Sequence, residues 1–305
     1  MSIDGALNLD AIKQSLATTI LGRDLIYLPT TKSTNEVATE AARSGAPEGT
    51  VVIAEEQTAG RGRLGRTWLA PAGSSLLFSL LLRPPLPPEQ LYLLTMIAAT
   101  SVVAAVERCT GLSCGVKWPN DVLIGGRKVA GILSEMSLAE GRTTFVVVGI
   151  GLNVNTDLSL LGEIASTATS LSAELGRPTE REPLLCQMLL EFENRYLPML
   201  KPVSEAVDGK MDVGAGDKPL PYISRNVGQG LVPCPKACSW NQVVFQEWRS
   251  RLVVLGQRVI VQGGLGAEEG LAEDVERDGS LLVRRDDGTQ FRVSAGDVSL
   301  RTVGR

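Results

Sequence analysis

The stretch Gly60-Arg61-Gly62-Arg63-Leu64-Gly65-Arg66 places three glycines and three arginines within seven residues. This composition disfavours a helix, and the arginines do not belong in an apolar core. Glycine lets a ligand approach the backbone closely, and the arginine guanidinium offers a fixed fork of donors to carboxylate or phosphate oxygens. We therefore expect a loop that holds an anion, and the segments on either side of it decide which fold carries that loop.

The spacing of the three glycines also matches the fingerprint of dinucleotide-binding folds, Gly-x-Gly-x-x-Gly. That fingerprint requires a helix directly after the loop and an acidic residue about 20 residues further on. Here a turn at residues 67–73 follows, then an apolar strand at 75–82, and no acid occurs before Glu89. We reject a dinucleotide-binding fold for this reason.

The flanking segments predict an α+β fold with a mixed or antiparallel sheet. Most apolar segments on either side of the arginine loop show the alternation of strands. Hairpin turns such as Gly125-Gly126 join several of these segments. Gly149 and Gly151 interrupt the last of these strands and indicate close approach by a ligand or another backbone. The expected strands are 24–28, 50–54, 75–82, 128–136 and 143–155, with a further one ending at Lys117; the expected helices are 8–22, 37–45, 89–109, 183–200 and 240–255.

Two helix starts carry the pattern of a capping box, Ser33 with Glu36 and Thr179 with Glu182. For Ser33 a second interpretation is open. Ser33, Thr34 and Asn35 place three short polar side chains at a helix N-terminus, which suits a polar group of a ligand.

The C-terminal part predicts a second, smaller domain. After Gly256 the chain consists of short strands with turns at Asp278-Gly279 and Asp287-Gly288, which is typical of a small β-barrel. Residues 201–239 are rich in Gly, Pro and Asp and show no periodicity, so we expect a flexible insertion there. The expected domains are residues 1–252, including this insertion, and residues 253–305.

Composition limits the class of protein. The chain has 305 residues, 44% hydrophobic and 21% charged, and a net charge of −4, which disfavours a general binder of nucleic acid or of membranes. No apolar run reaches the length of a membrane span, and the N-terminus shows no secretory signal pattern. Five scattered cysteines are typical of reduced thiols, so we expect a cytoplasmic protein.

The absence of histidine from the sequence excludes catalysis through an imidazole base. A zinc site would need cysteines or carboxylates, and Cys234 with Cys238 is a single close pair where structural zinc takes four ligands. We expect free thiols at both positions.

The remaining polar residues indicate phosphate chemistry. Arg61, Arg63, Arg66 and Lys117 are four cations, more than a single carboxylate needs, and they suit a polyphosphate. Phosphoryl and nucleotidyl transfer depend mostly on positioning and charge stabilisation, so they proceed without histidine. The residues alone therefore predict an ATP-using ligase or a nucleotidyl transferase.

Five motifs in one order resemble the biotin–protein ligase family. They are STN at 33–35, EEQTAGRGRLGRTW at 55–68, KWPND at 117–121, KVAGILSE at 128–135 and GIGLNVN at 149–155. The resemblance extends over residues 24–200 and again from 240 to the end. It implies a catalytic domain of the class II synthetase type, with a mixed sheet and flanking helices, followed by a small SH3-like β-barrel.

The resemblance implies a two-step reaction. Biotin and ATP first give biotinoyl-5′-AMP, and the biotinoyl group then passes to a lysine of a biotin carboxyl carrier protein. ATP and Mg²⁺ are the implied cofactors, with no bound prosthetic group. Lys117 and Arg63 would be catalytic, and Asp121 would help to place Mg²⁺. The implied biotin contacts are Ser33, Thr34, Asn35, Gln57, Gly60, Arg61, Gly62, Arg63, Trp68, Lys117 and Gly131, and the implied ATP or adenylate contacts are Arg61, Arg63, Arg66, Lys117, Asn120 and Asn153.

Departures and alternatives accompany this resemblance. The N-terminal segment is too short for the winged-helix DNA-binding domain of repressor-type members, so we expect no nucleic-acid partner and a monofunctional ligase. The 201–239 insertion is not in the usual pattern. A lipoate or octanoate ligase of related fold and a non-catalytic biotin sensor are the alternatives. The sequence leaves open whether the chain forms a homodimer.

Overall fold

The computed structural model describes residues 5–200, 240–263, 266–294 and 299–302. The described strands are β1 Leu25–Thr31, β2 Val51–Gln57, β3 Ser75–Leu82, β4 Gly115–Lys117, β5 Asp121–Ile124, β6 Arg127–Ala139, β7 Arg142–Asn153, β8 Arg258–Gly263, β9 Gly266–Val275, β10 Leu281–Arg284, β11 Gln290–Val293 and β12 Ser299–Thr302. The α-helices are α1 Leu9–Ser15, α2 Thr34–Arg43, α3 Tyr92–Thr110, α4 Leu171–Leu175, α5 Arg181–Tyr196 and α6 Trp240–Ser250, and short 3₁₀ helices cover Arg63–Gly65, Pro88–Gln90, Leu158–Ser166 and Leu197–Leu200.

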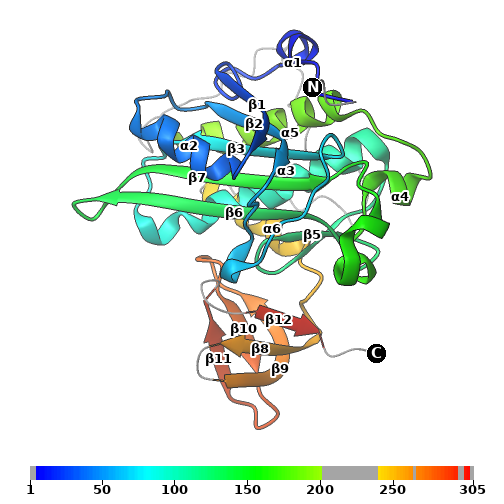
Figure 1. Cartoon of the computed structure of the whole chain (residues 1–305). Coiled ribbons are helices and arrows are strands. Elements are labelled where there is room, and N and C mark those ends of the chain that lie inside the picture. The colour runs from blue at the N-terminus through cyan, green and yellow to red at the C-terminus, as the bar shows by residue number, and fades with distance from the viewer. Residues whose placement is uncertain (1–4, 201–239, 264–265, 295–298, 303–305) are drawn as a thin grey trace, which may run out of the picture.

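These strands form two sheets. The larger sheet has seven strands in the order β1-β2-β3-β7-β6-β5-β4, and the smaller has five in the order β11-β10-β9-β8-β12 (Figure 1). In the larger sheet β1 and β2 pair in parallel and the other neighbours are antiparallel. The smaller sheet is antiparallel throughout. This is the predicted α+β fold, with a mixed sheet, flanking helices and a small C-terminal β-domain.

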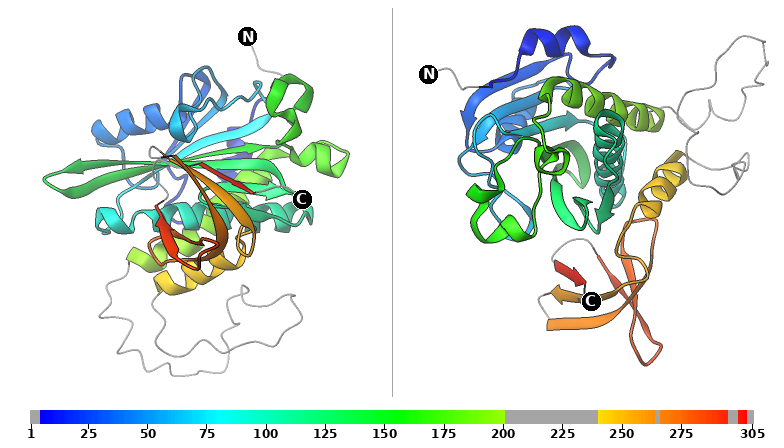
Figure 2. Two further views of the ribbon diagram at one scale, coloured as in Figure 1. Left: turned by 90° about the horizontal axis from the view of Figure 1, so that it is seen from below. Right: turned by 90° about the vertical axis from the view of Figure 1, so that its right-hand side faces the viewer.

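Strand alternation divides the residues of the larger sheet between two cores. On β7, Val146 and Val148 point into the main core, where α3, α5 and α6 lie together on one side of the sheet (Figure 2). Phe145 and Val147 point to the opposite face and pack in a smaller core with α2. Because α2 has only 10 residues, it covers part of that second face. The residues predicted for the site lie at the N-terminal end of α2 and on the part of the face beyond it.

Helix α3 corrects one expectation from the sequence. Residues 88–110 are long and apolar enough to cross a membrane by length and composition, so the expectation that no apolar run reaches this length is wrong. However, 78% of that apolar window is buried inside the protein. The helix packs between the sheet and helices α5 and α6, which explains why all its faces are apolar.

Two helices end earlier than the sequence predicts. The predicted helix 8–22 ends at Ser15, because the backbone N–H groups of the next segment bond elsewhere. Those of Ile20 and Leu21 donate to the Glu193 carboxylate of α5 at 2.9 and 2.8 Å. The predicted helix 240–255 ends at Ser250, after which residues 251–253 pair with Val116 of β4.

Neither predicted capping box forms. Ser33 is the residue that precedes α2, but its side chain caps nothing, and the N–H of Thr34 donates to Gln57 Oε1 at 2.7 Å instead. Helix α5 begins at Arg181 rather than after Thr179, whose N–H donates to Asn155 Oδ1 at 2.9 Å. In both places a side chain distant in sequence replaces the local cap.

The expected insertion 201–239, with its Cys234 and Cys238, lies outside the described residues. The described cysteines, Cys109, Cys114 and Cys186, are free thiols.

Candidate functional site

Strand β7 changes composition beside the N-terminal end of α2. Past Phe145 and Val147, which α2 covers, the same face of the strand carries Gly149 and Gly151. A Cβ atom on Gly149 would lie 2.2 Å from Asn35 Oδ1, and one on Gly151 would lie 2.6 Å from the Trp68 indole. The sequence predicted a close approach by a ligand or another backbone at these glycines, whereas the structure places two side chains of the predicted site there.

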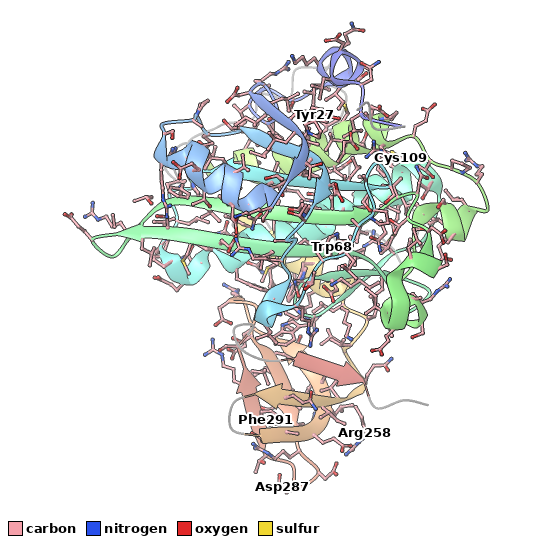
Figure 3. All side chains as sticks on the ribbon, viewed as in Figure 1. Tyr27, Trp68, Cys109, Arg258, Asp287 and Phe291 are labelled. Atoms are coloured by element: carbon pink, nitrogen blue, oxygen red, sulfur yellow. The ribbon has the colours of Figure 1, made fainter. Side chains whose placement is uncertain are left out.

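The register of the sheet aligns the other motifs with these glycines. Gly151 pairs with Gly131 on β6, Gly131 pairs with Asp121 on β5, and Asp121 pairs with Lys117 on β4. Directly paired residues of an antiparallel ladder share a face of the sheet. Lys117 thus points to the same face as the glycines. Trp68 lies over the middle of this face (Figure 3).

The arginine loop closes on itself as a short irregular hairpin. The Trp68 N–H donates to the Gly60 carbonyl at 2.9 Å, and the Gly62 N–H donates to the Arg66 carbonyl at 2.6 Å. A single 3₁₀ turn forms its tip, and Leu64 there adopts a left-handed conformation with φ 57°. No α-helix follows the loop, which agrees with the rejection of a dinucleotide-binding fold.

The three loop arginines have different surroundings. Arg61 turns towards acids: its Nη2 atom lies 3.3 Å from Glu135 on β6 and 3.8 Å from Glu36 on α2. Arg63 is half-buried and donates to Asn120 Oδ1 at 3.3 Å, which joins the loop to the turn after Lys117. Arg66 is exposed. Arg63 is thus the loop arginine that contacts the Lys117 turn.

A buried polar network occupies the end of the face next to α2. Gln57 Oε1 accepts from the Thr34 hydroxyl at 3.1 Å, and the Ser79 hydroxyl lies 2.8 Å from Thr34 Oγ1 and 2.6 Å from Asn35 Oδ1. The Asn35 amide donates to Glu135 Oε2 at 2.6 Å. This network joins three residues that the sequence predicts for the site, and Ser33 is buried beside it.

The sequence prediction did not include Ser79 and Glu135. Ser79 is a polar residue in the middle of an otherwise apolar strand, and that interruption was the available signal. Glu135 is the last residue of the KVAGILSE motif, but its partner Asn35 lies 100 residues away in the sequence.

At the other end of the face, Asp121 is already paired. Its Oδ1 atom lies 2.7 Å from Nζ of Lys128, a residue that the sequence prediction did not include. The Lys128 ammonium also lies 5.3 Å from the centre of the Trp68 ring. The Asn120 amide of the same turn donates to the Ile132 carbonyl at 2.6 Å.

Two buried polar atoms on this face have no hydrogen-bond partner within the described part of the chain. They are Nε1 of Trp68 and Oδ1 of Asn153. The amide nitrogen of Asn153 donates to the Thr169 carbonyl at 3.0 Å, so the amide group is oriented. An unpaired buried polar group is costly, and a polar ligand such as a nucleotide would supply the missing partners.

The surroundings of Asp121 do not fit a magnesium ion held by the protein. Mg²⁺ binds oxygen ligands in near-ideal octahedral geometry. The Asp121 carboxylate is occupied by an ammonium group, and among the described residues no three acidic, histidine or cysteine side chains gather into a metal site.

The described cysteines are unsuited to nucleophilic chemistry. Burial, together with the nearby Glu107 carboxylate, raises the pKa of the Cys114 thiol to about 12. Burial also raises the pKa of Cys109 and of Cys186. The thiolate is the nucleophilic form, so a raised pKa makes these thiols poorer nucleophiles at neutral pH.

Comparison with known proteins agrees with this geometry. The sequence pattern of the biotin/lipoate A/B protein ligase family matches residues 27–153, and that of the biotin protein ligase C terminal domain matches residues 254–301. The biotin–[acetyl-CoA-carboxylase] ligase of Mycobacterium tuberculosis is 33% identical over 283 residues, which cover 90% of this chain and 88% of the relative. The chain belongs to the biotin/lipoate A/B protein ligase family.

Two further relatives define how far the likeness extends. The bifunctional ligase/repressor BirA of Bacillus subtilis is 42% identical over 193 residues, which are 63% of this chain. That alignment spans only 59% of the length of the BirA protein. The biotin protein ligase of Aquifex aeolicus, solved in complex with biotin and ATP, superposes with a TM-score of 0.69 at 27% identity and covers 92% of this chain and all of that one. Family and fold therefore agree over both sheets.

Proposed function

We propose that this member of the family is a monofunctional biotin–protein ligase. The observation that carries the proposal is the polar network of Thr34, Asn35, Gln57 and Ser79, on the same sheet face as Lys117. The ureido ring of biotin has two N–H donors and a carbonyl acceptor, so it needs such polar partners. The dithiolane ring of lipoate and the tail of octanoate offer no comparable hydrogen bonds.

The proposed reaction has two steps. A carboxylate oxygen of biotin attacks the α-phosphorus of ATP, the bond to the β-phosphate oxygen breaks, and pyrophosphate leaves. The ε-amine of a carrier lysine then attacks the acyl carbon of biotinoyl-5′-AMP, an amide forms, AMP leaves, and the amine proton passes to solvent. Neither step requires a histidine or a protein thiolate.

In this proposal the protein acts by positioning and by charge. Lys117 stabilises negative charge on the biotin carboxylate and the α-phosphate, and Arg63 and Arg66 hold phosphates. Trp68 packs against the ligand, while Gly60, Gly62 and Gly131 let it approach the backbone. Arg61, paired with two acids, contributes through its backbone, and Asn120 orients Arg63. Asn153 contacts the nucleotide through its unpaired Oδ1 atom.

The proposal also covers partners and compartment. The acceptor is a biotin carboxyl carrier protein of a carboxylase, as the names of relatives suggest. Neither a nucleic-acid nor a membrane partner is part of the proposal, and a homodimer stays an open alternative. The free described cysteines support a cytoplasmic location. We divide the chain into a catalytic domain, residues 1–252, and a C-terminal barrel, residues 253–305.

The decisive experiment is ATP-dependent transfer of labelled biotin to a carrier domain. We expect transfer by the wild-type protein and a loss of about 100-fold or more in the rate of biotinoyl-AMP formation by Lys117→Ala, because one preorganised cation at the reacting phosphate is removed. Lys13→Ala, a change on the distant helix α1, serves as the control and should leave the rate unchanged.

Three results would contradict the proposal. Wild-type adenylation at the same rate by Lys117→Ala would remove the role of Lys117. Transfer of lipoate or octanoate instead of biotin would identify a related ligase. Biotin binding without release of pyrophosphate would indicate a sensor.

A further inference from the structure

Lys128 is a second lysine on the functional face of the sheet. Its Nζ atom lies 2.7 Å from Asp121 Oδ1 and 5.3 Å from the centre of the Trp68 ring. A Cβ atom on Gly131 would lie 3.0 Å from the same Nζ atom. The lysine side chain therefore extends across Gly131. The Lys128 side chain is about one third exposed, which leaves it accessible to a ligand on this face.

Two backbone hydrogen bonds to one neighbouring segment hold the backbone of Lys128. Its N–H donates to the Thr167 carbonyl at 2.8 Å, and its carbonyl accepts from the Thr169 N–H at 2.8 Å. The carbonyl of Thr169 in turn accepts a hydrogen bond from the amide of Asn153, whose Oδ1 atom has no partner among the described residues. One segment, residues 167–169, therefore positions both Lys128 and Asn153.

Asp121 fits the role of a partner to Lys128 better than that of a metal ligand. Its carboxylate makes a close charge-assisted contact with one cation. A carboxylate whose charge is balanced in this way attracts Mg²⁺ less strongly than an unpaired one would. Asp121 and Lys128 lie on neighbouring strands of one hairpin, so their pairing follows from the fold itself.

The position of Lys128 on the sheet face indicates which part of a ligand it would contact. The polar network that suits the biotin ring lies beside Gly149, next to α2. Lys128 lies on the other side of Trp68, close to Asp121, which pairs with Lys117 on the neighbouring strand. A ligand that extends from the network towards Lys117 would bring its phosphates to this end of the face.

We propose that Lys128 binds the phosphates of the nucleotide and that Asp121 positions Lys128 instead of binding Mg²⁺. The proposal rests on the proposed ligase function, because it assigns a residue to the same site. Mg²⁺ in this arrangement arrives with the phosphates of ATP. Lys128 is then a fourth side-chain cation for the triphosphate beside Arg63, Arg66 and Lys117.

The test measures nucleotide binding directly, by titration calorimetry with ATP in the absence of biotin, with and without Mg²⁺. We expect Lys128→Met to raise the Kd for ATP by about 10- to 100-fold, the loss of one charge-assisted contact, and Lys128→Arg to restore part of the affinity. Asp121→Asn should change the Kd for metal-free ATP and for MgATP by the same factor. A carboxylate that binds the metal would affect MgATP alone.

Arg127→Met is the matched control. Arg127 is the neighbour of Lys128 on β6, and it also pairs with an acid at 2.7 Å, Glu174. The Arg127→Met variant should bind ATP with wild-type affinity. This result would distinguish the effect of losing an ion pair from the effect of losing a phosphate contact. A melting temperature within a few degrees of the wild-type value would confirm that each variant is folded.

The proposal is overturned if Lys128→Met binds ATP with wild-type affinity, or if Asp121→Asn weakens MgATP by tenfold or more and leaves metal-free ATP unchanged. Failure of the ligase proposal has a different signature. In that case the wild-type protein would release no pyrophosphate with biotin and ATP, whatever the binding data for Lys128 show.

Discussion

At the scale of single residues, Ser79 organises the end of the site next to α2. Its side chain is fully buried, and its hydroxyl lies within hydrogen-bond distance of both Thr34 and Asn35. It also pairs in register with Gly149, so two small residues lie side by side beneath Asn35. The hydroxyl therefore fixes the orientation of two side chains that we expect to meet biotin.

Ser79→Ala tests this role. The change leaves a buried acceptor on Asn35 without its donor, which costs about 1–3 kcal/mol of unfolding free energy. We also expect biotin to bind roughly tenfold more weakly, because Asn35 and Thr34 lose their fixed orientation. Denaturant unfolding and biotin titration measure the two effects.

Ser101→Ala is the matched control for Ser79→Ala. Ser101 is equally buried, but its hydroxyl donates to the Ile97 carbonyl of its own helix, α3, at 2.7 Å. Its removal leaves a carbonyl that keeps its helical hydrogen bond, so we expect unchanged biotin affinity. Equal biotin affinities for the two variants would show that the Ser79 hydroxyl has no part in the site.

Residue types in short motifs predicted most of this site. Thr34, Asn35, Gln57, Trp68 and Lys117 all come to one face of the sheet, as the motifs indicate. The partners that orient them were not predictable, because each is set by pairing between distant segments. Arg61 is an example: two acids that only folding brings close hold its side chain.

At the scale of elements, the arginine loop from Gly60 to Trp68 is attached at its ends and open at its tip. Trp68 lies flat on the glycines of β6 and β7, and the Gly60 carbonyl holds the Trp68 N–H. The tip at Arg63–Gly65 contains an exposed Leu64 in a left-handed conformation. A segment with so few buried contacts opens at low cost, so we expect ligand binding to order it.

Limited proteolysis with trypsin measures this ordering, since the loop offers cleavage sites after Arg61, Arg63 and Arg66. With biotin and ATP together, we expect cleavage in the loop to slow by about tenfold or more, because an ordered loop opens less often. Arg142, the exposed first residue of β7, is the internal reference and should be cut at the same rate in both conditions. Equal loop cleavage with and without ligands would contradict the expectation.

The elements themselves were more predictable than their ends. Alternating or continuous β-branched residues identified β6 and β7, and a short apolar run bounded by turns identified β3. The helix ends were missed where a distant side chain takes the backbone hydrogen bonds. Glu193 does so after α1, Gln57 at the start of α2 and Asn155 before α5.

At the scale of the whole molecule, the small C-terminal sheet contacts the turn that follows Lys117. The indole of Trp118 is buried and donates to the carbonyl of Gly279, in a turn of the small sheet, at 2.8 Å. Tyr92 of α3 packs against the same glycine and donates to the Pro119 carbonyl at 2.5 Å. The C-terminal domain thereby supports the residue next to Lys117, so a change in that domain should reach the site.

The two Asp-Gly turns of the small sheet allow a controlled test of this support. Gly279 and Gly288 both adopt positive φ, at 85° and 84°. A Cβ atom on Gly279 would lie 1.9 Å from the Tyr92 ring, whereas one on Gly288 meets nothing within 4 Å. Asp287, beside Gly288, lies at the end of the small sheet far from the larger one (Figure 3).

We expect Gly288→Ala to lower the unfolding free energy by about 1–2 kcal/mol, the cost of a left-handed alanine, and to leave adenylation unchanged. Gly279→Ala adds the clash with Tyr92, so the total loss should be about 2–5 kcal/mol. Because the clash displaces Trp118 next to Lys117, kcat for biotinoyl-AMP formation should fall by about tenfold or more at a temperature where both variants stay folded. Denaturant unfolding and pyrophosphate release measure the two effects. An unchanged kcat for folded Gly279→Ala would show that the small sheet stabilises the turn without positioning Lys117.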